Sequence, residues 1–149
     1  MGLLLAVVLA TLVFRATGAS AHSFGSLQDE LQLQEARRHI LTQLEKIICY
    51  DAQRVIRLQE NGQITCTMVD ACKRVIIYSE KQGLYKKTSK NNGIGVNPVS
   101  LEGVGVTGWQ LQRCSPQLLR ISFKLSRNGR QLQVTRYLIC YNARITEDA

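Results

Sequence analysis

Two histidines, His22 and His39, are the only imidazoles available for acid–base chemistry in this sequence of 149 residues. Hydrolases that use an imidazole need it close to a second catalytic group. No histidine follows residue 39, so a hydrolase would depend on His39, which lies one helical turn after Glu35. A solvent-facing histidine stabilised by that glutamate is the simpler interpretation. The sequence therefore predicts a protein that is not an enzyme.

Metal and cofactor sites have no recognisable motif. The sequence contains no Cys-x-x-Cys, no His-Glu-x-x-His and no aspartate-rich calcium loop. The glycine-rich stretches "GIGVN" and "GVGVTGW" lack the Lys-Ser/Thr pair that opens a helix after a phosphate-binding loop. We expect no metal and no cofactor.

The cysteines are more informative about structure than about catalysis. Five are present, an odd number: Cys49, Cys66, Cys72, Cys114 and Cys140. In an exported chain they would meet an oxidising compartment, and we expect two intramolecular disulfides with one cysteine left over. The spacing does not choose between the pairings. The odd cysteine is either a buried thiol or a link to a second chain in a disulfide-bonded homodimer.

Positive charge gathers in two stretches of a chain whose net charge is +8. One is "YSEKQGLYKKTSK" and the other is the last predicted hairpin. The candidate binding residues are Lys81, Tyr85, Lys86, Lys87, Lys90, Arg120, Lys124, Arg127 and Arg130. If they share one face, they would attract a sulfated glycan, an acidic protein or an anionic membrane. The alternative is an ordinary solubilising surface. Nucleic acid is not expected as a partner of a secreted protein.

The N-terminus resembles a secretory leader. An apolar run from Leu3 to Phe14 is followed by Ala19-Ser20-Ala21, a small-x-small pattern that signal peptidase accepts. The sequence predicts a signal peptide over residues 1–21 and one secreted, extracellular domain over 22–149. The apolar run is too short for a permanent membrane anchor, and no later stretch reaches the roughly 18 apolar residues of a membrane span, so no membrane span is expected.

A long amphipathic helix is predicted over residues 26–48. Ser26 and Asp29 have the spacing of a capping box at its start. The apolar positions recur every three or four residues and define one face to bury: Leu33, Ala36, Ile40, Leu41, Leu44, Ile47 and Ile48. The opposite positions are polar, so this helix should pack against the rest of the domain.

Residues 51–142 are predicted to form an antiparallel β region. Asn61-Gly62 and Asn128-Gly129 each suit a tight hairpin turn, because both central residues of a type I′ turn have positive φ. The second turn sets a register in which Leu125 faces Leu132. Further strands are predicted at "KRVIIYS" and "WQLQRC". The Gly-, Lys- and Asn-rich segment 80–108 is predicted to be a mobile loop.

These elements predict an α+β fold: one N-terminal amphipathic helix on an antiparallel sheet of about five strands, stabilised by disulfides. The layout resembles the cystatin architecture, in which a sheet wraps one helix. The Gln-x-Val-x-Gly inhibitory loop of that family is absent, since the corresponding turn reads "QENGQ". The resemblance therefore concerns the fold and implies no protease inhibition.

The preferred function is that of a secreted, non-enzymatic ligand or binding module for a protein or polyanionic partner. One alternative is a venom or host-defence polypeptide that acts on a channel or membrane, which the same charge and cysteines favour. A small secreted hydrolase that depends on His39 is the other alternative.

Overall fold

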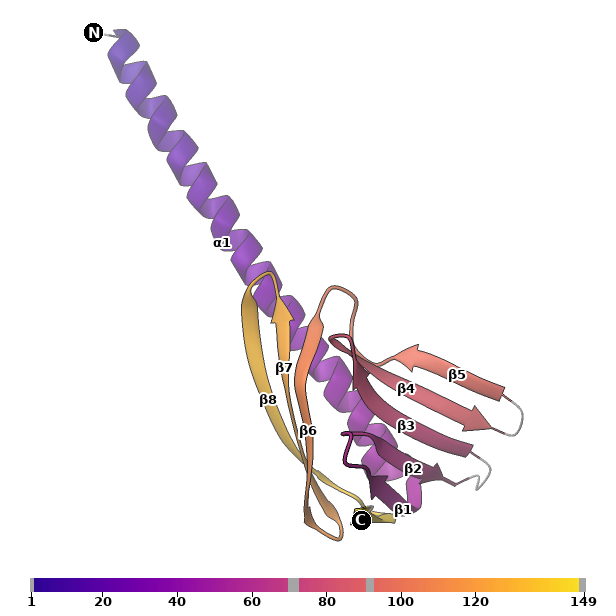
Figure 1. Ribbon diagram of the computed structural model, residues 1–149. Helices are drawn as coiled ribbons and strands as arrows, with labels where there is room; N and C mark the ends of the chain where they lie inside the picture. Colours follow the sequence, from indigo (N-terminus) through magenta and orange to yellow (C-terminus); the bar gives the residue numbers. More distant parts are fainter. Residues whose placement is uncertain (1, 70–72, 91–92, 148–149) are drawn as a thin grey trace. The chain divides into compact units, whose positions relative to one another are not determined.

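The computed structural model describes residues 2–69, 73–90 and 93–147 (Figure 1). The chain divides into two compact units, Met1–Gln32 and Leu33–Ala149. Helix α1 (Gly2–Glu45) contributes to both and continues into a short π-helical turn, η1 (Lys46–Asp51). The first unit is helical throughout its described residues, whereas the second contains all the described strands.

The second unit is an α+β domain with two sheets, as Figure 1 shows. The strands are β1 (Ala52–Leu58), β2 (Ile64–Met68), β3 (Lys73–Glu80), β4 (Gly83–Lys90), β5 (Gly93–Pro98), β6 (Gly105–Ser115), β7 (Leu118–Arg127), β8 (Arg130–Ile139) and β9 (Ala143–Glu147). Six form one sheet in the order β5-β4-β3-β2-β1-β9, and three form the other in the order β6-β7-β8. The α+β class is confirmed. The prediction of one antiparallel sheet of about five strands is wrong, because the described strands form two sheets of six and three strands, and β9 pairs in parallel with β1.

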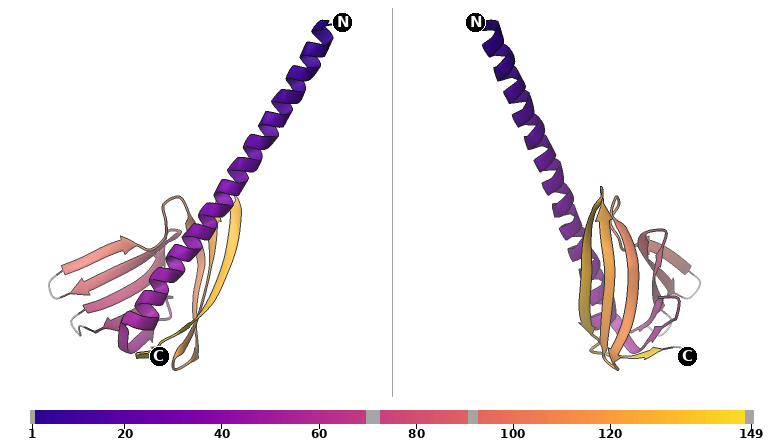
Figure 2. Two further views of the ribbon diagram at one scale, coloured as in Figure 1. Left: turned by 180° about the vertical axis from the view of Figure 1, so that it is seen from behind. Right: turned by 60° about the vertical axis from the view of Figure 1, so that its left-hand side comes forward.

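The C-terminal part of α1 buries the face that the sequence predicts. Leu33, Ala36, Ile40 and Leu44 are almost fully buried, and Leu41 is partly buried beside them. Figure 2 shows this part of the helix beside both sheets. The predicted helix start is wrong: Ser26 and Asp29 lie inside α1 and do not cap its first turn. Ser26 and Asp29 have the spacing of a capping box, but the helix begins well before them, so they are interior residues of α1.

The β7–β8 hairpin follows the predicted register. Asn128 and Gly129 have φ values of 48° and 80°, as a type I′ turn requires. Leu125 pairs with Leu132 and Phe123 pairs with Val134. One face of the hairpin therefore enters the core and the other faces solvent.

The β1–β2 hairpin is also present, but its turn is wider than predicted. Residues 59–63 connect the strands, with a hydrogen bond from the backbone N–H of Gln59 to the carbonyl of Gln63. Gly62 has a φ of 77°, whereas Asn61 is not among the residues with positive φ. The connection is therefore not the predicted two-residue turn.

Segment 80–108 is not the predicted mobile loop. It contains β4, β5 and the first residues of β6. Three of its glycines, Gly83, Gly103 and Gly105, lie where an added Cβ would come closer than 3 Å to a neighbouring side chain, which for Gly83 is the ring of Tyr85. The loop prediction relied on glycine content, and glycine can also occur within strands such as β4 and β5.

The predicted disulfides are not present among the described cysteines. Cys49, Cys66 and Cys140 are buried free thiols, and Cys114 is an exposed one. Cys72 lies outside the described residues. The described core is held by packing of helix and sheet side chains, such as Phe123, Ile40 and Ile56, each fully buried.

Candidate interaction surfaces

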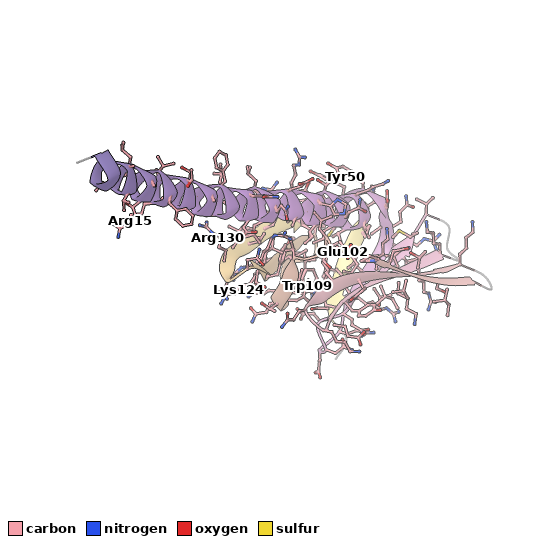
Figure 3. All side chains as sticks on the ribbon, turned by 90° about the horizontal axis from the view of Figure 1, so that it is seen from above. Arg15, Tyr50, Glu102, Trp109, Lys124 and Arg130 are labelled. Atoms are coloured by element: carbon pink, nitrogen blue, oxygen red, sulfur yellow. The ribbon has the colours of Figure 1, made fainter. Side chains whose placement is uncertain are left out.

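The predicted basic residues are divided between the two sheets. Lys86, Lys87 and Lys90 lie on β4, at one side of the six-stranded sheet, with Lys81 in the β3–β4 turn. Lys124 and Arg130 lie on the three-stranded sheet and are labelled in Figure 3.

Neighbouring lysines on β4 point to opposite faces of the sheet. Lys86 pairs with Ile77, whose side chain is buried in the core, and so it lies on the inner face. Lys87 pairs with Ile76 on the outer face and with Val96 of β5. The outer face also receives Arg57 and Arg74, which the sequence did not single out. The alternation of a strand is the signal that could have found them.

An aromatic pair lies on the same outer face. Tyr78 of β3 pairs with Tyr85 of β4, and their rings stack with centroids 5.8 Å apart. Exposed Ile94 and Val96 of β5 add apolar surface close to Lys87. This outer face therefore combines aromatic, apolar and cationic groups, which is typical of protein recognition surfaces.

Two hairpin tips bring one predicted pair of cations together. Lys81 and Arg127 both line a pocket of about 440 Å³ between the β3–β4 and β7–β8 turns. Arg127 donates from Nη1 to the carbonyl of Gly103, 3.2 Å away. Gly103 has a φ of 76°, and a Cβ there would lie 2.7 Å from Nη1 of Arg127. This positive φ favours glycine at position 103, and the missing Cβ leaves room for the guanidinium of Arg127.

Arg120 and Lys124 lie on the solvent-facing side of β7. Arg120 donates from Nη1 to Oε1 of Gln112 on β6, 3.2 Å away. Lys124 pairs across the strands with Thr107 and Gln133. This side of the three-stranded sheet is polar and basic, and it is separate from the pocket at the hairpin tips.

A second cleft, which the sequence did not predict, lies beside the β1–β2 turn. We call it the Trp109 cleft; it has a volume of about 540 Å³ and is lined by Leu58, Glu60, Trp109, Leu111 and Glu147, among others. The indole Nε1–H of Trp109 donates to the carbonyl of Gly62 at 2.8 Å. Its ring lies 5.9 Å from that of Phe123, centroid to centroid. The turn and the core thus fix the indole in place.

The buried thiols are poor nucleophiles. Burial raises the pKa of Cys66 to about 12, with a smaller contribution from Cys140 nearby. Burial also raises the pKa of Cys140 to about 12, with a smaller contribution from Cys49. Because the thiolate is the reactive form, these side chains are suited to packing rather than to catalysis.

The N-terminal unit carries apolar side chains without protein contacts. Among the described side chains before Phe24, all are exposed, including Val8, Leu12 and Phe14. Figure 3 shows side chains extending from opposite sides of this part of α1, with Arg15 on one of them. By length and composition the helix is a candidate membrane span, with an 18-residue window of mean hydropathy 1.2.

No cluster of three or more histidine, cysteine or acidic side chains that could hold a metal ion occurs within the described ranges. His39 is exposed on α1. No protein-family model matches the chain, and no curated protein and no solved structure gives a significant match. The function therefore has to be inferred from the surfaces themselves.

Proposed function

We propose that this protein is a bilayer-anchored, non-enzymatic binding protein. The apolar part of α1 inserts into a membrane, and the α+β unit binds an extracellular protein or acidic polymer through its basic surfaces. The observation that carries the proposal is the exposure of apolar side chains along α1 between Val7 and Phe24.

The physical argument concerns the solvent around this helix segment. A helix that is apolar on all sides is stable in lipid or among other helices, and unfavourable in water. A span of the hydrocarbon core takes about 20 residues, which the segment from Ala6 to Gly25 supplies. All its backbone groups except those at the ends are paired within the helix, as lipid requires.

Arg15 is the one Lys, Arg, Asp or Glu in this segment. A guanidinium at the centre of a span costs about 3 kcal/mol on insertion scales. Its long side chain can extend towards the interface, which lowers this cost. The apolar residues around it, including Val13 and Phe14, offset the remainder.

A secreted protein released by cleavage after Ala21 is the second candidate. Ala19-Ser20-Ala21 and the position of Arg15 favour it, because the arginine weakens the segment as a permanent span. The two candidates share the same α+β unit and differ in the N-terminus of the final product.

Membrane extraction separates them. The full chain is expressed with its own N-terminus, membranes are washed with alkaline carbonate, and the intact mass is measured. We expect the protein in the membrane pellet with the residues before Ala21 retained. A product that begins at His22 and stays in the supernatant would instead establish the secreted form.

The binding role is tested through the basic surface of β4. Lys86→Glu combined with Lys87→Glu should reduce retention on a heparin column, because both faces of the strand lose a positive charge. Arg38→Glu combined with Lys46→Glu makes the same charge change on exposed helical positions and serves as the control. Equal loss of retention in both variants would show that net charge alone determines binding.

A further inference from the structure

We propose that the Trp109 cleft is a binding site for a basic side chain, an arginine or lysine on an exposed segment of a partner protein. The cleft lies wholly within the α+β unit. It is distinct from the basic surfaces above, and its charge has the opposite sign.

The charge of the cleft favours a cation. Its rim carries two carboxylates, Glu60 and Glu147, in a chain whose net charge is +8. Glu147 pairs in register with Leu58, so it lies on the core-facing side of the sheet, beside the cleft. Within the described residues, neither carboxylate has a recorded ion-pair partner, whereas Glu45 pairs with Arg136. Two carboxylates facing one cleft repel each other and attract a positive group.

The apolar lining fits the stem of the same side chain. Leu58, Leu111 and the indole of Trp109 provide an apolar wall next to the carboxylates. Lysine and arginine combine an aliphatic stem with a cationic head, and they bury the stem while the head stays polar. An arginine head can also lie against the indole, which is the strongest aromatic partner for a cation. A phosphate or carboxylate ligand would be repelled.

The wall of the cleft is already ordered. The Nε1–H of Trp109 is bonded to Gly62 at 2.8 Å, and its ring packs on Phe123. Binding therefore does not have to order the indole, which lowers the entropy cost of association.

A second copy is a less suitable occupant than another protein. Two copies that each carry a net charge of +8 repel one another over their surfaces. A partner that is acidic overall and presents one basic side chain complements both the basic surface and this cleft.

The sequence offers a direct probe, because Trp109 is its only tryptophan. The full chain in detergent is titrated with the peptide acetyl-Gly-Arg-Gly-amide while indole fluorescence is recorded. The matched peptide with citrulline has the same shape without the charge. We expect the fluorescence to change saturably with the arginine peptide, and with the same peptide carrying lysine in its place, and not to change with the citrulline peptide.

Variants assign the site. Glu60→Gln combined with Glu147→Gln should weaken the arginine peptide by about tenfold or more, since charge-assisted hydrogen bonds are lost. Glu35→Gln combined with Glu102→Gln removes the same charge outside the cleft and should leave the affinity unchanged. Circular dichroism checks that each variant is folded, and the single Glu147→Gln, at an exposed strand end, is used if the double variant is not.

Three results would overturn the proposal. They are equal binding of the citrulline peptide, unchanged affinity in the folded Glu60/Glu147 variant, and self-association that this variant abolishes. The last result, measured by sedimentation, would assign the cleft to a second copy of the chain.

Discussion

The two parts of helix α1 bury their apolar residues in different ways. After Gln32, the residues Leu33, Ala36, Ile40 and Leu44 form a stripe with at most 3% of their surface exposed. Before it, Leu9, Leu12 and Phe14 are 55%, 58% and 82% exposed. Both parts are helical, so secondary structure does not distinguish them. The difference lies in whether the protein itself covers the apolar side chains.

One continuous helix can therefore have one part suited to packing against the protein and another part suited to an apolar environment outside it. The second part is amphipathic and needs one covered face, which the sheets provide. In the first part, Leu9, Leu12 and Phe14 are exposed, so the described protein does not cover them. An external apolar phase, a bilayer in our proposal, is the natural complement of that part.

The largest expected effect comes from breaking the covered part. Ile40→Ala removes a fully buried side chain from the core and should lower the free energy of unfolding of the α+β unit by about 2–5 kcal/mol. Leu12→Ala is the matched control in the exposed part and should change it by less than about 0.5 kcal/mol. Denaturant unfolding in detergent measures both. Equal destabilisation would mean that the two parts are not covered differently.

The complementary change breaks the exposed part. Leu12→Arg places a second charge near Arg15, and insertion scales put the cost of a central arginine at about 3 kcal/mol. We expect about a hundredfold less partitioning into lipid vesicles, with the unfolding of the α+β unit unchanged. Leu12→Ile keeps the apolar character and should partition like the native chain. Unaltered partitioning of the Leu12→Arg variant would contradict the proposal that this part of α1 inserts into a membrane.

Periodicity predicted the covered part of α1 because burial leaves a pattern in the sequence. Ile40 and Leu44 recur at helical spacing, and Phe123 and Leu125 alternate with polar residues. The sequence therefore predicts the buried face of α1 and the buried face of the β7–β8 hairpin. The Asn128-Gly129 turn added the register. These features are local, and local physics determines them.

The remaining fold depends on contacts that are distant in sequence. The parallel pairing of β9 with β1 joins Arg57 to Thr146, and no local pattern encodes such a partner. The Trp109 cleft likewise combines a turn, a strand of the second sheet and the C-terminal strand. The prediction for segment 80–108 is wrong for a different reason: glycine-rich composition suggests mobility, whereas Gly83, Gly103 and Gly105 lie in closely packed positions.

Cysteine reactivity tests whether the core that covers the second part of α1 is closed. Because Cys66 and Cys140 have pKa values of about 12, their thiolate fraction near pH 8 is about one in ten thousand. We expect a thiol reagent to modify exposed Cys114 in seconds to minutes, and Cys66 and Cys140 only on unfolding. Mass spectrometry of the labelled peptides identifies the sites, and Cys114→Ser should remove the rapid labelling of its own peptide.

The raised pKa values of Cys66 and Cys140 also predict that the free energy of unfolding depends on pH. Their ordinary pKa is 9.0, so above about pH 9 the unfolded chain releases protons that the folded chain retains. The unfolding free energy should therefore fall between pH 9 and 12, by up to about 1.4 kcal/mol per pH unit for each thiol. Cys66→Ala combined with Cys140→Ala should flatten this decline. A decline of equal slope in that variant would assign it to other groups.

The smallest expected effect on the free energy of unfolding concerns an ion pair at the end of the covered part of α1. Arg136 interrupts the apolar row of β8 opposite Ile121, and its guanidinium reaches Glu45 at the end of α1, with Nη2 3.2 Å from Oε1. The pair is substantially exposed, at 54% and 36% of the two side chains, so water screens most of its attraction. Arg136→Gln should lower the unfolding free energy by no more than about 1 kcal/mol. Adding Glu45→Gln should cost little more, because the two residues share one interaction. If this double-mutant cycle gave a coupling as large as the loss from Ile40→Ala, polar contacts would rival apolar burial in holding the second part of α1.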